Sequence, residues 1–134
     1  MIVVLIIAIL ATIALPVYND YVLRARLTDG TEALMAMRGQ MELYYEDNRT
    51  YAEVGTLKPP CETSPNAGLF AVSCTVDATT YTVTATGSGP TAGFTYTINE
   101  QEVQATTAIP RKWGTLPTTT TCDAWITRKG QSCS

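Results

Sequence analysis

The chain has 134 residues, of which 46% are hydrophobic and 16% are charged, and its formal net charge is -3. This length suits a single domain, and the lack of any histidine excludes Ser-His-Asp and Cys-His active sites and metal sites built on imidazole. A pI near 4.8 argues against bulk attraction to nucleic acid, although local basic patches are compatible with it.

The chain opens on an uncharged apolar run, from Met1 to Val17, whose only polar side chain is that of Thr12. Three interpretations are open: a cleaved signal peptide, a buried core helix and a membrane helix. A signal peptide would begin with positive residues and end at a small-x-small site, and the best candidate for that site is the weak Thr12-Ile13-Ala14. A membrane helix usually takes about 20 apolar residues, so we expect that a few residues precede Met1 in the mature protein.

An amphipathic segment follows the apolar run without a turn signal between them. Its apolar residues recur at helical spacing and form one stripe: Leu23, Leu27, Leu34, Met37, Met41 and Tyr45. A single helix from Met1 to about Asn48 would be roughly 70 Å long. Because a globule of this size has a radius of gyration of only about 14 Å, the apolar half of the helix must protrude. Pro16 removes one backbone hydrogen bond and is expected to kink or loosen the turn before it.

Beyond Asn48 the sequence changes to turn residues and to short stretches with a period of two. Lys58-Pro59-Pro60 marks a loop, and the alternation predicts strands at residues 69–76, 81–86, 94–98 and 103–107. Short polar connections favour an antiparallel meander, whose apolar face the helix stripe would cover. The predicted fold is therefore α+β, with the C-terminal half of a long N-terminal helix packed on a four-stranded antiparallel sheet.

Four cysteines form an early pair, Cys61 and Cys74, and a late pair, Cys122 and Cys133. Three connectivities are open to them, and we expect neighbours to bond in order, 61 with 74 and 122 with 133. Each closed loop is worth roughly 3 kcal/mol in the chain-entropy account. Zinc binding is disfavoured because neither pair has the short C-x₂₋₄-C spacing, and four reduced thiols are the remaining alternative. Oxidised cysteines would place the domain outside the cytoplasm.

The order of small residues, proline and tyrosines near the N-terminus is distinctive: the run Met1 to Ala14, then Pro16, then Tyr18-Asn19-Asp20-Tyr21. Further motifs lie downstream: Tyr44-Tyr45-x-Asp47-Asn48-x-Thr50-Tyr51, Gly87-Ser88-Gly89-Pro90, and the segment Cys122 to Cys133 with Trp125 and Lys129. Together they resemble the type IV pilins of Gram-negative bacteria, in particular PilE-like minor pilins. The resemblance spans nearly the whole chain.

This resemblance implies a structural subunit of a surface filament that resides in the inner membrane before assembly. Residues 1–22 would be the membrane and filament-core helix, and residues 23–134 the globular pilin domain with a disulfide-closed C-terminal loop. The implied partners are other copies in a helical filament and the pilus assembly machinery, and the implied roles are adhesion, twitching motility or DNA uptake. In bacterial filaments of the family the helix is commonly melted before the proline, which here would fall between about Ile9 and Pro16.

In the family, a prepilin peptidase cuts before a Phe-Thr-Leu-Ile-Glu stretch and the new amine is methylated. The sequence begins after the place of that stretch, and we expect that it starts late, at an internal methionine.

The candidate site residues serve assembly and binding in this interpretation. The filament core and helix kink would use Ala8, Ala11, Thr12, Ala14 and Pro16. Charges on the exposed helix would set the register between subunits: Asp20, Arg24, Arg26, Asp29 and Glu32. In the C-terminal loop, Trp125, Arg128 and Lys129 form a candidate contact for DNA or a host-surface glycan, because an aromatic ring beside cations suits both. The alternative for these cations is solvated charge or contacts between subunits.

Catalysis is not expected, because the sequence has no paired carboxylates, Gly-rich phosphate loop or calcium-type acidic cluster. We therefore predict no enzyme activity, no metal and no cofactor. The alternatives to a structural pilin are a low-copy minor pilin or tip module that binds DNA or a surface ligand, and a secretion-system pseudopilin, which two disulfides disfavour. Asn48-Arg49-Thr50 and the run Thr118 to Thr121 are weak candidates for glycosylation.

Overall fold

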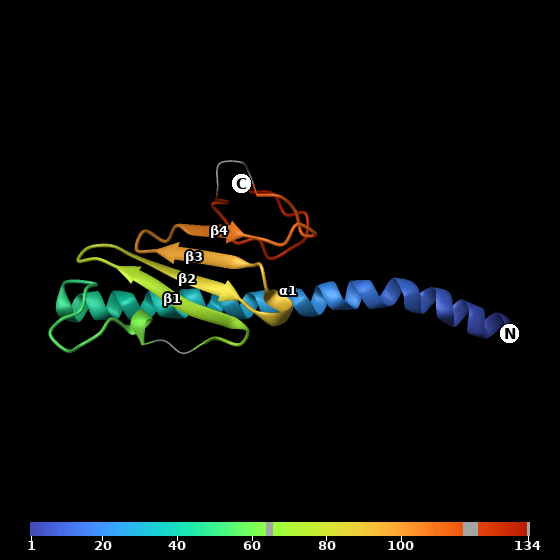
Figure 1. Ribbon diagram of the computed structural model, residues 1–134, viewed down its shortest axis with the longest axis horizontal. Coiled ribbons are helices and arrows are strands. Elements are labelled where there is room, and N and C mark those ends of the chain that lie inside the picture. Colours follow the sequence, from blue (N-terminus) through green and yellow to red (C-terminus); the bar gives the residue numbers. More distant parts are fainter. Residues whose placement is uncertain (64–65, 117–120, 134) are drawn as a thin grey trace.

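The computed structural model describes residues 1–63, 66–116 and 121–133. Its elements are a long helix, α1 (Ile2–Asn48), and four strands, β1 (Phe70–Val76), β2 (Tyr81–Gly87), β3 (Thr95–Asn99) and β4 (Gln104–Ala108), with short 3₁₀ turns before β1 and β3. The C-terminal half of α1 lies against the sheet, and its N-terminal half extends away from the domain (Figure 1). This is the predicted α+β fold, and the bounds of each predicted strand agree with the structure to within one residue.

The helix α1 is continuous over 47 residues, with Pro16 inside it. The turn before Pro16, which was expected to kink or loosen, is therefore helical in the single subunit; the melting implied between about Ile9 and Pro16 concerns the assembled filament and stays a prediction. A proline removes only one N–H donor, and the bonds of the neighbouring turns continue the helix past it. The Thr12 hydroxyl also donates to the Ile9 carbonyl at 2.7 Å. Figure 1 shows a gentle curve of the N-terminal half and no sharp kink.

The sheet is an antiparallel meander with the strand order β1-β2-β3-β4. Val83 of β2 lies opposite both Cys74 of β1 and Ile98 of β3, which aligns their side chains on one face. Because side chains alternate along a strand, that face carries the buried residues Phe70, Tyr81, Val83, Ala85, Tyr96 and Ile98. The opposite face carries mainly threonine and serine, so only one face of the sheet needs a cover.

The helix stripe provides that cover. Leu27, Leu34, Met37 and Met41 are buried, and Leu23 and Tyr45 pack against the same core at its margins, as the spacing predicted. Tyr44 is a further buried side chain of α1, and its hydroxyl lies 3.0 Å from the Ala52 carbonyl oxygen. It fixes the loop that leaves the helix.

Gly30 marks the closest approach between α1 and the sheet. A Cβ atom at this position would lie 2.8 Å from the ring of Phe70, closer than packed carbon atoms approach one another. The glycine therefore lets the helix backbone sit directly on a buried aromatic ring of β1, and its low helix propensity is offset by packing.

Both disulfides pair as predicted, Cys61 with Cys74 and Cys122 with Cys133. The first bond ties the loop after α1 to β1. The second closes the C-terminal loop, which is joined to the edge of the sheet because the Thr106 N–H donates to the Cys122 carbonyl at 2.8 Å. The C-terminal segment has no regular pattern in sequence, and these links hold its described residues on the domain.

Candidate functional site

Residues 1–19, which we call the stem, are all exposed. Each large apolar side chain of the stem is at least 51% exposed. An 18-residue stretch of α1 near its N-terminus is long and apolar enough to cross a membrane, and none of it is buried within the protein. An apolar surface of this extent marks a contact with lipid or with other protein. The predicted core and kink residues, Ala8, Ala11, Thr12, Ala14 and Pro16, all lie on it.

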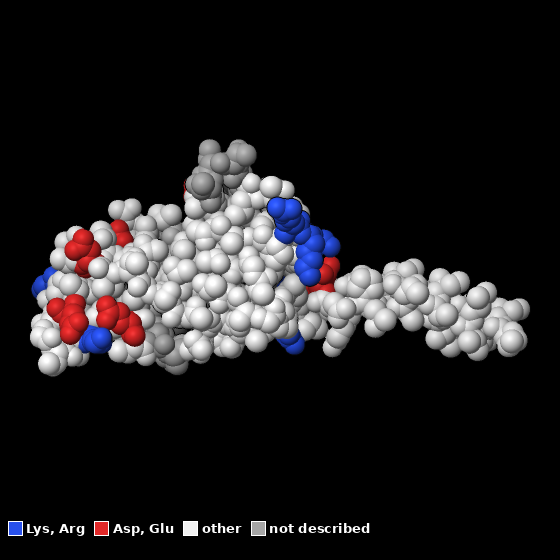
Figure 2. All heavy atoms as spheres, in the orientation of Figure 1, with Lys and Arg blue, Asp and Glu red and all other residues white. Residues whose placement is uncertain are grey.

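Basic residues gather where α1 leaves the domain, and Figure 2 shows Lys and Arg side chains at the base of the stem. We call this group the basic collar: Arg24, Arg26, Arg111, Lys112, Arg128 and Lys129. It combines three segments that are distant in sequence. In the sequence these residues form three separate pairs, at positions 24 and 26, 111 and 112, and 128 and 129. The fold brings the pairs together.

Two grooves beside α1 show how the collar is assembled. One groove, of about 270 Å³, is lined by Arg24 and Tyr21 from the helix and by Arg128 from the C-terminal loop. The other, of about 330 Å³, places Arg26 of the helix beside Lys112. The Lys129 Nζ atom lies 3.9 Å from the Asp20 Oδ2 atom in an exposed ion pair, which joins the C-terminal loop to the helix. The collar thus surrounds the helix on more than one side.

Buried residues beside the collar hold its loops in place. Trp113 follows Lys112, is buried, and packs edge-on against Phe94 with ring centroids 5.1 Å apart. The Tyr96 hydroxyl donates to the Ile126 carbonyl at 2.6 Å, which anchors the segment that leads into Arg128 and Lys129. The segments that carry these cations are therefore anchored to the core of the domain.

Trp125 was predicted to lie with Arg128 and Lys129 in one ligand contact. In the structure its indole N–H donates to the Thr97 carbonyl at 2.9 Å, and its ring is partly buried against the core. Arg128 and Lys129 are exposed. The aromatic side chain that shares a groove with Arg128 is instead Tyr21, which is 71% exposed. The sequence did not indicate this pairing because the two residues are more than one hundred positions apart.

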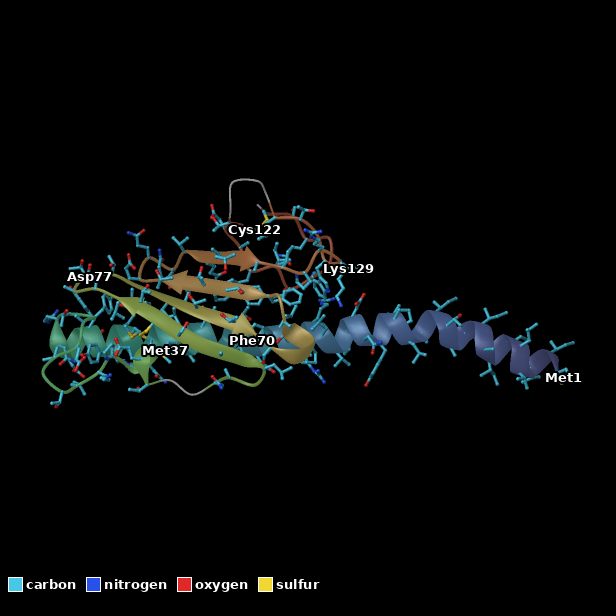
Figure 3. The ribbon with its side chains drawn as sticks, viewed as in Figure 1. Met1, Met37, Phe70, Asp77, Cys122 and Lys129 are labelled. Carbon is cyan, nitrogen blue, oxygen red and sulfur yellow. A yellow bond between two sulfur atoms is a disulfide. The ribbon has the colours of Figure 1, made fainter. Side chains whose placement is uncertain are left out.

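The opposite end of the domain is acidic. Figure 2 shows carboxylates gathered there, and Figure 3 places Asp77 at that end and Lys129 at the stem end. Arg38 of α1 forms an ion pair with Glu102, next to β4, across this end. Between the two ends, the face seen in Figure 2 is a broad uncharged surface. The domain therefore has a charge polarity along its long axis that its net charge conceals.

Glu42 of α1 is a half-buried carboxylate at the acidic end. Its Oε1 atom accepts hydrogen bonds from the hydroxyls of Tyr51 and Tyr81, each at 3.2 Å. Burial and the neighbouring Glu42 carboxylate raise the pKa of Tyr51 to about 12, and burial with the same carboxylate raises the pKa of Tyr81 further. Both tyrosines stay protonated at physiological pH, and this cluster ties α1 to β2.

The remaining residues that the sequence analysis singled out do not belong to the collar. Asp29 lies beside Gly68, and Glu32 is exposed on α1. Thr118, Thr119 and Thr120 of the candidate glycosylation run lie outside the described residues. Within the described ranges, no group of three or more Cys, Asp or Glu residues could hold a metal ion. The geometry supports binding by an apolar rod and a basic surface.

Comparison with protein families found a match to one family of pilins. The model of the family described as type IV minor pilin ComP, DNA uptake sequence receptor, matches residues 16–108, which is more than half of the chain. The match includes the collar residues of α1 and all four strands. Neither the curated proteins nor the solved structures give a match.

Proposed function

The chain belongs to the type IV minor pilin family, and we propose that it resides in the inner membrane through residues 1–22 and then polymerises into a surface filament. Residues 23–134 would form the globular pilin domain on the outside of that filament. The observation that carries this proposal is the exposed stem, which is continuous with a helix half whose apolar stripe is packed on the sheet. The stem needs an apolar surrounding that the domain does not provide.

Lipid and neighbouring stems can each provide that surrounding. Transfer from the bilayer into a filament replaces lipid contacts by protein contacts of the same apolar kind, so close packing decides which is preferred. Ala8, Ala11 and Ala14 would allow stems to approach closely. A shallow apolar groove runs along the stem and offers a surface for a second helix, lined by Leu10, Ile13, Ala14, Val17, Tyr18 and Tyr21.

A matched pair of substitutions tests this proposal. Leu10 and Leu43 lie on the same helix and are 61% and 63% exposed, but only Leu10 belongs to the stem. Leu10→Lys places a charge in the apolar surrounding, at a cost of about 2.5–3.5 kcal/mol in a membrane, and Leu43→Lys leaves a charge in water. We expect Leu10→Lys to remove the protein from sheared pili and Leu43→Lys to leave it there. Equal recovery of both variants in pili would contradict the proposal.

The helix charges Asp20, Arg24, Arg26, Asp29 and Glu32 are proposed to set the register between neighbouring subunits. Arg24→Glu reverses one of them at an exposed position, so the domain should still fold. We expect fewer filaments with this variant, counted by electron microscopy, and an unchanged unfolding midpoint. Normal piliation would contradict the proposal that Arg24 sets the register between subunits.

DNA is the ligand that we propose for the assembled subunit. The matching family is described as a DNA uptake sequence receptor, and the collar offers cations from three segments of the chain. Phosphate contacts of Lys and Arg dominate DNA affinity and need no basic net charge. Tyr21 beside Arg24 and Arg128 would add an aromatic surface for stacking. A low-copy subunit with this surface suits the minor pilin class, and its share of the protein in sheared pili measures its copy number.

The salt dependence of DNA binding tests this ligand. Arg24→Gln/Arg128→Gln removes two collar cations, and Arg49→Asn/Lys58→Gln removes two cations away from the collar. For duplex DNA each phosphate contact contributes about -0.9 to the slope of log K against log salt. The collar variant loses two contacts, so its slope should be less steep by about 1.8. The control variant should match the wild type. Equal slopes for the wild type and the collar variant would contradict the proposal that the collar binds DNA.

A further inference from the structure

Three kinds of side chain follow one another along the axis of the molecule. The stem is uncharged as far as Val17, exposed tyrosines follow at Tyr18 and Tyr21, and the collar begins at Arg24. Figure 3 places Met1 at the tip of the stem and Lys129 where the stem meets the domain. An apolar span, interfacial aromatic residues and then cations is the order of side chains found from the hydrocarbon core of a bilayer to its surface.

The distances fit the thickness of a bilayer. Residues 1–17 span about 25 Å as a helix, comparable with a hydrocarbon core of about 30 Å. Arg24 lies seven positions after Val17 and therefore about 10 Å farther along the axis, at the depth of the lipid headgroups. Lys112 and Arg128 share grooves with Arg26 and Arg24, so the two loops reach the same level as the helix cations.

We propose that the collar docks the domain on anionic phospholipid headgroups while the subunit waits in the membrane. The inference rests on the proposed function, because it takes the stem to lie in the bilayer. The acidic end faces away from the membrane in the same orientation, so attraction at one end and repulsion at the other favour a single seating. Each Lys or Arg near an anionic membrane surface contributes about a fivefold factor to such a docking equilibrium.

This seating has a consequence for when the subunit binds DNA. Phospholipid and DNA both present phosphodiesters to the same cations. A subunit whose collar is docked on headgroups therefore has these cations occupied, and extraction from the membrane releases them from the headgroups. Membrane docking would in this way reserve DNA binding for the assembled subunit.

Hydrogen exchange of the full chain in lipid nanodiscs tests the docking. The probe lipids are phosphatidylcholine alone and phosphatidylcholine with one quarter phosphatidylglycerol. We expect amides of residues 111–116 and 125–133 to exchange at least about threefold more slowly with phosphatidylglycerol, and this protection to disappear in 0.5 M salt. The variant Lys112→Gln/Arg128→Gln should lose it, and Arg49→Asn/Lys58→Gln, which removes the same charge elsewhere, should keep it.

The same data separate failure of the docking from failure of the proposed function. Protected amides in residues 2–17 show that the stem is inserted, and unprotected ones would overturn the membrane anchor itself. With an inserted stem, equal exchange of the collar loops in both lipids would overturn the docking alone. Loss of protection in both double variants would assign the effect to net charge and would also overturn it. Loss of the loop protection on addition of duplex DNA would support the proposal that DNA and lipid phosphates compete for the same cations. Unchanged protection would overturn the proposal that membrane docking prevents DNA binding.

Discussion

The two halves of α1 have the same backbone and opposite surroundings. In the C-terminal half, Leu27, Leu34 and Met41 are fully buried against the sheet, whereas the stem leucines, such as Leu10 and Leu15, are more than 60% exposed. The apolar stripe of the packed half is buried within the domain, and the apolar side chains of the stem are not. The comparison teaches that one continuous helix can serve as a structural element of the fold and expose an apolar surface, with the change falling between the exposed residues 1–19 and the first buried side chain, Leu27.

The largest expected effect comes from the same substitution made in each half. Leu34→Ala should lower the free energy of unfolding by about 2–5 kcal/mol, because it leaves a cavity in the core. Leu10→Ala should change it by less than about 0.5 kcal/mol, because nothing in the domain packs on that side chain. Guanidinium unfolding of the full chain in mild detergent, followed by tryptophan fluorescence, measures both. Similar losses would mean that the stem contributes to the core.

The disulfides should stabilise the domain alone. Cys61→Ala/Cys74→Ala removes the bond that ties the loop after α1 to β1, and it should lower the unfolding free energy by about 3 kcal/mol. The helical circular dichroism of the stem in detergent should stay unchanged, since neither cysteine touches it. A loss of stem helicity together with the domain would show that the two halves are coupled.

Two glycines of α1 sharpen the comparison within the packed half. Gly30→Ala places a methyl group against Phe70 and should cost about 1–3 kcal/mol. At Gly39 an added Cβ would meet no neighbouring atom within 4 Å, so Gly39→Ala should instead stabilise by about 0.5–1 kcal/mol through helix propensity. Chemical denaturation of both variants measures the change in the free energy of unfolding, which should fall for Gly30→Ala and rise for Gly39→Ala. Equal effects would show that propensity, and not packing, decides at Gly30.

The smallest expected effect is a dependence of domain stability on alkaline pH. Tyr51 has a pKa of about 12 in the folded domain against an ordinary value of 10.0, so the unfolded chain loses this proton first as pH rises. Stability should therefore be constant below about pH 9 and should fall between pH 10 and pH 12. Tyr51→Phe should reduce that fall in urea titrations. An unchanged pH profile in this variant would contradict the raised pKa that burial and the Glu42 carboxylate give Tyr51.

Local patterns predicted most of the fold. The helical stripe from Leu23 to Tyr45 and the period of two in the strands each report which face of an element is buried, so the helix, the four strands and their order followed from them. The cysteines bonded in order, as expected. Tyr44 was missed because it lies beside Tyr45 at the margin of the stripe, where spacing alone does not show which tyrosine turns inward.

The collar could be predicted only in parts, because its members come from separate segments. Arg24 and Arg128 meet only after the C-terminal loop has folded onto the sheet, and no local period reports such a contact. The ion pair of Lys129 with Asp20 has the same origin. The turn before Pro16 was expected to kink or loosen, and it stays helical in the single subunit because the hydrogen bonds on either side of the lost one remain.

The most direct test of the division within α1 is the stability of residues 23–134 alone. If the packed half of the helix completes the domain, this fragment should be monomeric in water without detergent. Its free energy of unfolding should lie within about 1 kcal/mol of the value for the domain in the full chain. A fragment that is unfolded, or that loses several kcal/mol, would contradict the account, because the stem would then be part of the fold rather than a surface for lipid and for other subunits.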